Sequence, residues 1–467
     1  MNFGPYDMLM DFGIMSILLF VAQVIRAKVK FVQNMYLPAS MIAGFLGLFL
    51  GSQFLNILPF SGNIASYPYM MIVVLFAGLF LGNNEKSSFK EVVNKVGDTF
   101  TLNLAAEVGQ FGFAIVIGGL ILTKLFPQVN HSFALLMPAG FVGGHGYAAA
   151  IGGTLKDILG WDEAITIGQT FATLGLLCGV FGGIILINIA TRVKATRLIK
   201  TMGELPKSMQ TGLIPKKEQN SMGLNTINSM SLDSLTWHVG LVLIATAGGY
   251  YAFYGFKRLV PNASLPMMSL SMLAGVLLQF ILNRMKLAEY IDKKIMTRIG
   301  GASTDFLVGF GIASIKISVV IKYAIPILIM LLIGVVYALL FLSFIGRRLF
   351  HNFWFERSIF IYGWITGVVA MGVTLLRIVD PEFKTEALED YGMAYVFISF
   401  IELFIVSVVP LFVAKGQGLI AGVILLIVFS ALLIITATKY GVQSSSITEL
   451  REGESEVIAE LNNSESF

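Results

Sequence analysis

The residues best suited to binding chemistry lie in the segment FVGGHGYAAAIGG, residues 141–153, where three glycines surround His145. These glycines are Gly143, Gly144 and Gly146. Such glycines weaken a helix, permit backbone conformations that other residues avoid and let a ligand approach the main chain. Tyr147 then begins a second helical stretch, whose free N–H groups are suited to hold a carboxylate. The segment predicts a broken helix that binds a ligand, with close helix packing as the alternative use of its glycines.

The imidazole of His145 has three possible roles in such a break. It can hold a proton, bond to a substrate, or donate to a carbonyl and brace the chain. Its position between glycines favours bracing or ligand binding over catalysis.

A second segment of this kind is YGWITGVVAMGVTLLRIVDPE, residues 362–382. We expect its break near Thr366, Gly367 and Gly372. Thr374 offers a hydroxyl group to a substrate. Arg377, near the end of the segment, either pairs with a substrate carboxylate or anchors the chain at the membrane surface.

Polar side chains inside apolar segments form a second group of candidates, for a coupling ion. Glu107 and Gln110 lie about one turn apart and share a helix face, and Glu402 lies in the middle of its segment. Ionisable groups at membrane depth are costly, so they are functional candidates by default. Asp305 and Thr173 supply further oxygen ligands. In the alternative interpretation Asp305 meets lipid headgroups and Thr173 bonds back to its own helix.

The elements that carry these residues belong to a membrane protein. Of the 467 residues 56% are hydrophobic and 13% are charged, whereas about 25% are charged in a typical soluble protein. The single cysteine, Cys178, excludes an intramolecular disulfide, and the four histidines are too scattered for a metal set. We find no nucleophile–base spacing, phosphate-binding loop or basic–aromatic pattern. The sequence therefore predicts an all-α polytopic membrane protein with no enzyme activity, no cofactor and no nucleic-acid partner.

A helix needs about 20 apolar residues to cross a bilayer. Segments that meet this requirement lie at 7–25, 37–55, 67–83, 99–123, 164–190, 235–256, 264–283, 299–318, 324–346, 392–414 and 417–438. Two more apolar segments, 132–156 and 355–377, contain the glycine breaks, and we expect each to be a pair of half-helices that returns to the side it entered from.

The positions of the basic residues orient these segments, because Lys and Arg concentrate in cytoplasmic loops. With the N-terminus outside and the C-terminal tail in the cytoplasm, most of the 32 Lys and Arg residues fall on the inner side. The exceptions are Lys124, Lys156, Lys257, Arg258, Lys316, Lys322 and Lys415. We expect a multi-pass protein of a bacterial inner membrane.

The two halves of the chain repeat the same order of elements. Residues 1–193 give five spans, with the broken segment 132–156 entered from outside. Residues 235–416 give five spans, with the broken segment 355–377 entered from inside. Inverted repeats of this kind are common in transporters. A basic cytoplasmic linker, 194–234, joins the halves, and an additional span at 417–440 precedes an acidic tail, 441–467.

The stretch GGHGYAAA, followed by TFATLGLLCGVFGG at 170–183, resembles the sodium/glutamate symporter family. Further similar features are LFAGLFLGNN at 75–84, Gln110, IPKKEQ at 214–219 and FIELFI at 400–405, where the family has an acidic residue at the place of Glu402. The resemblance is stronger in the first half. It implies two inverted five-span repeats with re-entrant loops, sodium as the coupling ion, glutamate as the substrate and a homodimer. The second loop departs from the family pattern, because Leu375 and Leu376 follow Thr374 where proline and small polar residues are typical.

Together these features predict a sodium-coupled symporter for glutamate or a related anionic amino acid or carboxylate, working by alternating access. The substrate site would combine the first break with Thr366, Gly367, Thr374 and Arg377. A proton-coupled antiporter or exporter of small organic anions on the same fold is the main alternative. An intramembrane enzyme or a structural subunit is a third possibility, which the lack of catalytic spacing disfavours.

Overall fold

The computed structural model describes residues 3–34, 37–82, 96–193, 195–196, 208, 211–259, 267–380 and 384–442. Within these residues all regular secondary structure is helical, and ten helices are long and apolar enough to cross a membrane. The protein is therefore an all-α, multi-pass membrane protein, as predicted. Residues 194, 197–207 and 209–210 of the linker, residues 443–467 of the predicted acidic tail and the basic residues Lys86, Lys90 and Lys95 lie outside the described residues.

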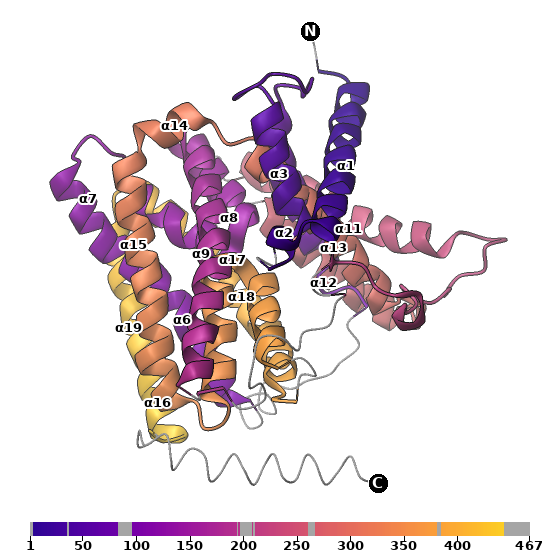
Figure 1. Ribbon diagram of the computed structural model, residues 1–467. Helices are drawn as coiled ribbons and strands as arrows, with labels where there is room; N and C mark the ends of the chain where they lie inside the picture. Colours follow the sequence, from indigo (N-terminus) through magenta and orange to yellow (C-terminus); the bar gives the residue numbers. More distant parts are fainter. Residues whose placement is uncertain are drawn as a thin grey trace, which may run out of the picture.

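The helices pack into two bundles (Figure 1). The first bundle contains α1 (Pro5–Lys28), α3 (Ala39–Leu50), α4 (Tyr67–Gly78), α11 (Ser234–Leu259), α12 (Met267–Arg284) and α13 (Lys293–Ala313). The second contains α6 (Gly97–Phe113), α7 (Gly119–Leu125), α8 (Leu136–Leu159), α9 (Ala164–Arg192), α15 (Ala324–Leu340), α16 (Arg347–Leu349), α17 (Trp354–Val379), α18 (Ala387–Ala414) and α19 (Gly418–Lys439). The short helices α2 (Lys30–Asn34) and α14 (Ile317–Lys322) lie in connections.

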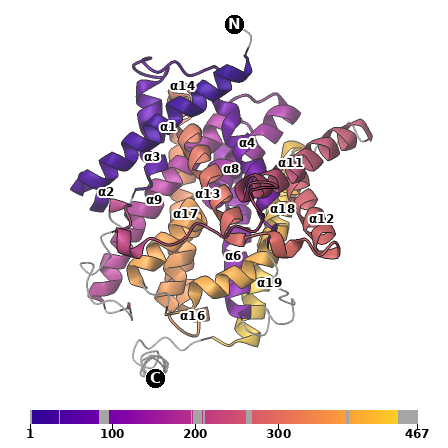
Figure 2. The ribbon, with the colours of Figure 1, turned by 90° about the vertical axis from the view of Figure 1, so that its right-hand side faces the viewer.

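Each bundle draws helices from both halves of the chain. The first three long helices of each half form the first bundle, and the later ones, with the helices broken at glycine, form the second. The halves also share a detail. In each half, a π-helical segment follows the long helix that precedes the broken helix. These segments are Ala114–Gly118, directly after α6, and Phe341–Gly346, directly after α15. Figure 1 and Figure 2 place α8 and α17, which contain the breaks, in the middle of the molecule.

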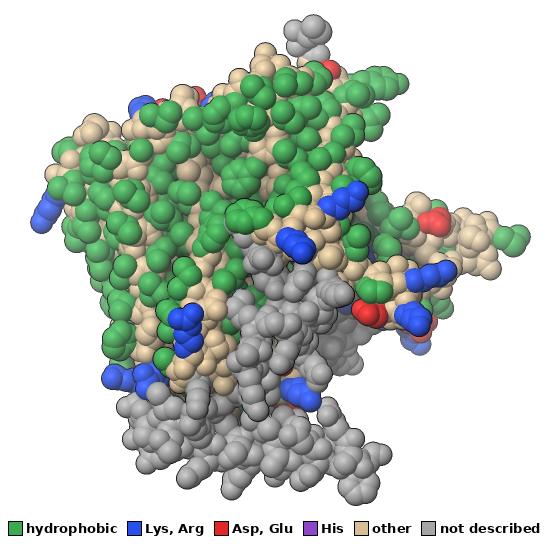
Figure 3. Space-filling view, in the orientation of Figure 1, with side chains coloured by type: hydrophobic (Ala, Val, Ile, Leu, Met, Phe, Trp, Pro, Cys, Tyr) green, Lys and Arg blue, Asp and Glu red, His purple; other side chains and the backbone are tan. Residues whose placement is uncertain are grey.

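The outer flank of the protein is apolar, as a lipid-facing surface must be. On α15, every fourth residue from Leu328 to Leu340 is half exposed and aliphatic. Figure 3 shows this flank, and more of its visible Lys and Arg side chains lie in the lower half of the view than in the upper half. The helix α16, which contains Arg347 and Arg348, lies in that lower half.

The predicted span 299–318 is a continuous helix only to Ala313, where α13 ends, and two other predicted spans are also shorter than predicted. The segment 37–55 contains only the helix Ala39–Leu50, which stops at the extended Gly51. The segment 67–83 contains only Tyr67–Gly78, and the chain then turns at Gly82, which has a φ of +75°. In both cases glycine ends a helix that the apolar pattern alone would continue.

Candidate functional site

The first break lies at Gly144 in α8, inside the segment that the sequence singles out. Its φ of 59° and ψ of −151° interrupt the helix, and this conformation is essentially open to glycine alone. Gly143 and Gly146 are also sterically required, because a Cβ at Gly143 would overlap the Tyr147 ring and one at Gly146 would overlap Ile72. The three glycines thus allow a tight, densely packed break.

The second break lies at Gly367 and Val368 in α17, where Val368 has a φ of 65° and a ψ of 167°. A positive φ is a rare, strained conformation for a β-branched residue. The chain doubles back here, because a Cβ on Gly363 would lie 2.8 Å from the Cα of Gly372. A straight helix would separate these residues by about 13 Å. The expected break at Gly372 does not occur, since this glycine is helical and packs against the other arm of the hairpin.

The two breaks meet each other. A Cβ on Gly144 would lie 2.5 Å from Cγ1 of Val368, so the backbone of the first break contacts the side chain of the second. Two segments more than 200 positions apart in sequence therefore form one site.

A glutamine amide stabilises the backbone next to each break. Gln169 of α9 donates from Nε2 to the carbonyl of His145 at 3.0 Å, and Gln110 of α6 donates from Nε2 to the carbonyl of Ile365 at 2.9 Å. Buried carbonyls freed by a helix break need such donors, because lipid supplies none. Each glutamine keeps a buried Oε1 with no hydrogen-bond partner among the described residues.

A cavity of about 300 Å³ lies beside the two breaks, between the two bundles. Gly143, His145, Gly146 and Tyr147 of α8 and Val368 of α17 line one side. Helices α4 and α13 of the first bundle line the other. The volume is at the lower end of the usual range for small-molecule sites.

Glu402 of α18 also lines this cavity and is 2% exposed. Its Oε2 accepts hydrogen bonds from the Tyr147 hydroxyl at 2.8 Å and the Tyr395 hydroxyl at 3.2 Å. Two hydroxyl donors stabilise the ionised carboxylate in an otherwise apolar setting. The first break is thereby joined to α18 through a charge-assisted hydrogen bond.

His145 has a defined tautomer in this arrangement. The Thr173 hydroxyl donates to the carbonyl of Gln169 at 2.9 Å, so its oxygen accepts from His145 Nε2 at 3.0 Å. The neutral ring then presents Nδ1 as an acceptor, and that atom is buried without a hydrogen-bond partner among the described residues. The imidazole braces the break at one nitrogen and offers the other to a ligand.

One face of α6 presents a row of unpartnered acceptor oxygens. Asn103, Glu107 and Gln110 follow the i, i+4, i+7 spacing of one helix face and are buried. Asn103 Oδ1, both carboxylate oxygens of Glu107 and Gln110 Oε1 have no hydrogen-bond partner among the described residues. Buried acceptors of this kind require a compensating cation or proton.

The other predicted site residues lie away from the cavity. The Thr366 hydroxyl donates to the carbonyl of Tyr362 at 2.6 Å, and that of Thr374 to the carbonyl of Ala370 at 2.8 Å. Arg377 is exposed and does not line the cavity. Asp305 is exposed on α13, where it contacts Ser40.

The sequence analysis missed five residues of this site: Asn103, Gln169, Trp364, Tyr391 and Tyr395. Gln169 lies one helical turn before Thr173, and Tyr395 lies two turns before Glu402, so helical spacing from the predicted residues points to both. Trp364 lines the cavity, but an aromatic residue in an apolar segment gives no functional signal.

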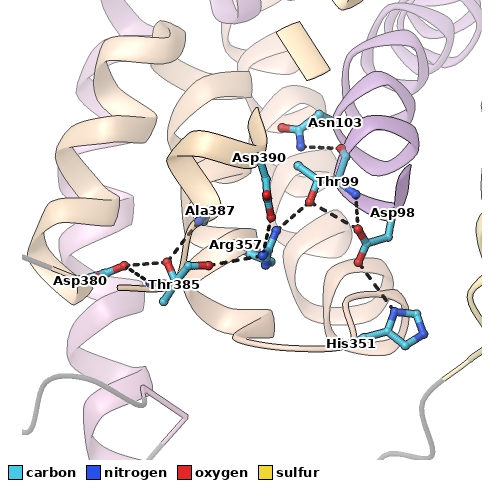
Figure 4. Close-up of polar contacts among 9 residues, drawn as sticks. All are labelled: Asp98, Thr99, Asn103, His351, Arg357, Asp380, Thr385, Ala387 and Asp390. Atoms are coloured by element: carbon cyan, nitrogen blue, oxygen red, sulfur yellow. Dashed lines mark hydrogen bonds and ion pairs between the residues drawn. The ribbon is translucent and has the colours of Figure 1, made fainter. Parts of the chain in front are cut away.

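A polar network holds the start of α17 in place (Figure 4). The buried Arg357 donates to Asp390 of α18 and to Thr99 of α6, both at 2.7 Å, and to the carbonyl of Thr385 at 3.3 Å. Asp380, at the end of α17, accepts from the backbone N–H of Thr385 at 2.9 Å. The start of the second broken helix is therefore fixed to α6 and α18, and its end to the connection that leads into α18.

Apolar helices around a cavity formed by two broken helices define the class of this protein as a membrane transporter. The family model for the sodium/glutamate symporter matches residues 5–380, and the chain therefore belongs to the sodium/glutamate symporter family. This confirms the resemblance seen in the sequence. A comparison with curated proteins found no match. The family match ends before Glu402, so it leaves the similarity at 400–405 as a prediction.

Proposed function

We propose that this protein is a sodium-coupled symporter that carries a small amino acid across the membrane by alternating access. The observation that carries the proposal is the row of unpartnered oxygens on α6. A buried Glu107 next to the amide oxygens of Asn103 and Gln110 is an arrangement suited to a hard monovalent cation.

The location of the cavity supports alternating access. The cavity lies between two bundles that meet through small residues, since Gly311 of α13 packs against His145 and Gly146 of α8 packs against Ile72. Small residues allow close helix contact without interlocking side chains. In our proposal the bundles move relative to each other and expose the cavity to one side at a time, and the two breaks act as the tips of re-entrant, inverted repeats.

Coupling of ion binding to substrate transport requires contact between the two proposed sites, and hydrogen-bonded residues join them. Gln110 bridges the α6 oxygens to the carbonyl of Ile365 in the second break. A cation on α6 would offset the charge of Glu107 and Glu402, and an empty site would leave these charges uncompensated in a low-dielectric region. We propose that this penalty prevents movement of the unloaded protein. Thr173 and Asp305 are additional predicted ion ligands.

The greater number of visible Lys and Arg side chains in the lower half of the view, where α16 also lies, supports an N-terminus outside and a cytoplasmic C-terminus (Figure 3). The bacterial inner membrane and a homodimer, which the family resemblance implies, complete the proposal.

Proton coupling is the competing proposal, and one observation favours it. A buried carboxyl without a partner, as Glu107 is, can also be neutralised by a proton. The protein would then exchange protons for a small organic anion.

Uptake into proteoliposomes separates the two proposals. Radiolabelled amino acids, including glutamate, are supplied with an inward sodium gradient and a protonophore that removes the proton gradient. We expect accumulation with sodium and none with potassium, and the Glu107→Gln variant should lose it. Glu389→Gln, a substitution of the same kind at an exposed position of α18, is the matched control. Accumulation that follows a pH gradient without sodium would favour the antiporter.

A further inference from the structure

The walls of the cavity are mainly apolar and aromatic. Leu75 of α4, Leu79 just after α4 and Val308 of α13 line it from the first bundle. Val369 and Trp364 line it from α17. Such walls favour a ligand that places an apolar group against them.

The cavity offers no cationic side chain to a substrate. Among the described residues that line it, Glu402 is the one acidic side chain, and no Lys or Arg is present. Arg377, the predicted partner of a substrate carboxylate, does not line it. Glutamate carries two carboxylates, and the second would enter an apolar space next to Glu402 with no cation to compensate it.

Two acceptors suit a substrate ammonium group. The Glu402 carboxylate is fixed by Tyr147 and Tyr395, and His145 presents an unpartnered Nδ1. Both residues line the cavity, so an ammonium placed there finds a charged and a neutral acceptor.

Donors for one carboxylate lie at the breaks. The residues that follow each break, from His145 in α8 and from Val369 in α17, begin half-helices whose first N–H groups have no partner within the helix. The partial positive charge of a helix N-terminus attracts an anion. The Tyr391 hydroxyl, which is buried without a partner among the described residues, lines the same cavity.

Resting on the proposed transport function, the geometry points to a substrate with one ammonium group, one carboxylate and an apolar side chain. The cavity takes an aliphatic or aromatic neutral amino acid in preference to glutamate. Glu402 and His145 hold the ammonium group, and the half-helix N-termini with Tyr391 hold the carboxylate.

Sodium-dependent currents of reconstituted protein on a solid-supported membrane test this assignment. The compounds are glutamate, glutamine, leucine and phenylalanine, together with 4-methylpentanoate and 3-methylbutylamine, which are leucine without its ammonium group and without its carboxylate. We expect the half-saturating concentration of leucine or phenylalanine to be at least about tenfold below that of glutamate, and each truncated compound to be at least about tenfold weaker than leucine.

Variants of Glu402 provide the second measurement. Glu402→Gln should raise the half-saturating concentration of leucine by more than about tenfold, and Glu402→Asp should recover part of this loss. Glu389→Gln should change nothing, and thermal unfolding of each variant checks its fold. A lower half-saturating concentration for glutamate or glutamine than for leucine and phenylalanine would overturn the assignment and leave the transport function standing. The absence of sodium-dependent current with every compound would overturn both.

Discussion

Replacement of Gly144 by alanine adds one methyl group at the contact between the two breaks. Alanine would have to adopt a φ of 59° and a ψ of −151°, a conformation that costs about 1–3 kcal/mol. Its Cβ would also lie 2.5 Å from Cγ1 of Val368, and such overpacking costs about 1–3 kcal/mol. Val368 itself has a positive φ, so its backbone has little freedom to move away from the new methyl group. The combined loss of stability should be about 2–6 kcal/mol.

Two further variants divide this loss into its parts. Gly153→Ala is the matched control on the same helix, because a Cβ there meets nothing within 4 Å, and it should stabilise α8 by about 0.5–1 kcal/mol. Adding Val368→Gly to Gly144→Ala removes the clash and should recover about 1–3 kcal/mol. The backbone cost at Gly144 would remain.

Thermal unfolding in detergent measures these differences, with a thiol-reactive dye as reporter. Cys178 is the single cysteine and is partly buried, so its exposure follows unfolding. We expect Gly144→Ala to unfold several degrees below the wild type and Gly153→Ala at or above it. Equal unfolding temperatures for these two variants would refute the geometry of the first break.

Three more predictions concern the surrounding polar contacts. Arg357→Met leaves Asp390 buried without its partner at 2.7 Å and should cost about 3–5 kcal/mol, whereas the double variant Arg357→Met/Asp390→Leu should cost less; thermal unfolding in detergent decides between these outcomes. Gln110→Leu removes the donor to a buried carbonyl and should cost about 1–3 kcal/mol in the same assay, and no loss would show that the carbonyl finds another donor. The ion pair between Nδ1 of His351 and Oδ2 of Asp98, 3.7 Å apart (Figure 4), raises the pKa of the imidazole. Its contribution to stability is therefore complete below pH 6.5, the ordinary value, and disappears as the pH rises through the higher value of the folded state. His351→Gln should lower the unfolding temperature at pH 6 and leave it unchanged at pH 9. The loss in the free energy of unfolding at pH 6 should be less than about 1 kcal/mol, because the pair is partly exposed. An equal effect at both pH values would exclude the ion pair as its cause.

Local sequence predicted the helices and the first break well, for physical reasons. Long apolar runs must form helices in a membrane because no other structure satisfies their backbone. The cluster around His145 identified the first break because consecutive glycines remove the steric limits on the chain. Glu402 was predicted to be functional because an ionisable residue in the middle of an apolar run is costly, and the structure places it in the wall of the cavity.

Features that depend on distant contacts were not predictable in this way. The second break falls at Val368, a residue whose local preference opposes a positive φ, so only the packing around it can impose that conformation. Arg377 was expected at the substrate because of its charge, but it lies on an exposed face of α17. The hydroxyl of Tyr147 donates a hydrogen bond to Glu402, which lies 255 positions away in the sequence. Neither segment contains a local pattern that predicts this hydrogen bond.

Equilibrium binding of ²²Na⁺ to the purified protein tests the central claim most directly, because the proposal rests on the oxygens of α6 as a cation site. The wild type and Glu389→Gln should bind sodium saturably and be stabilised by it against unfolding. Glu107→Gln should bind at least about tenfold more weakly, although without sodium it should be at least as stable as the wild type, since it removes an uncompensated buried carboxylate. Sodium binding by Glu107→Gln equal to that of the wild type would contradict the account.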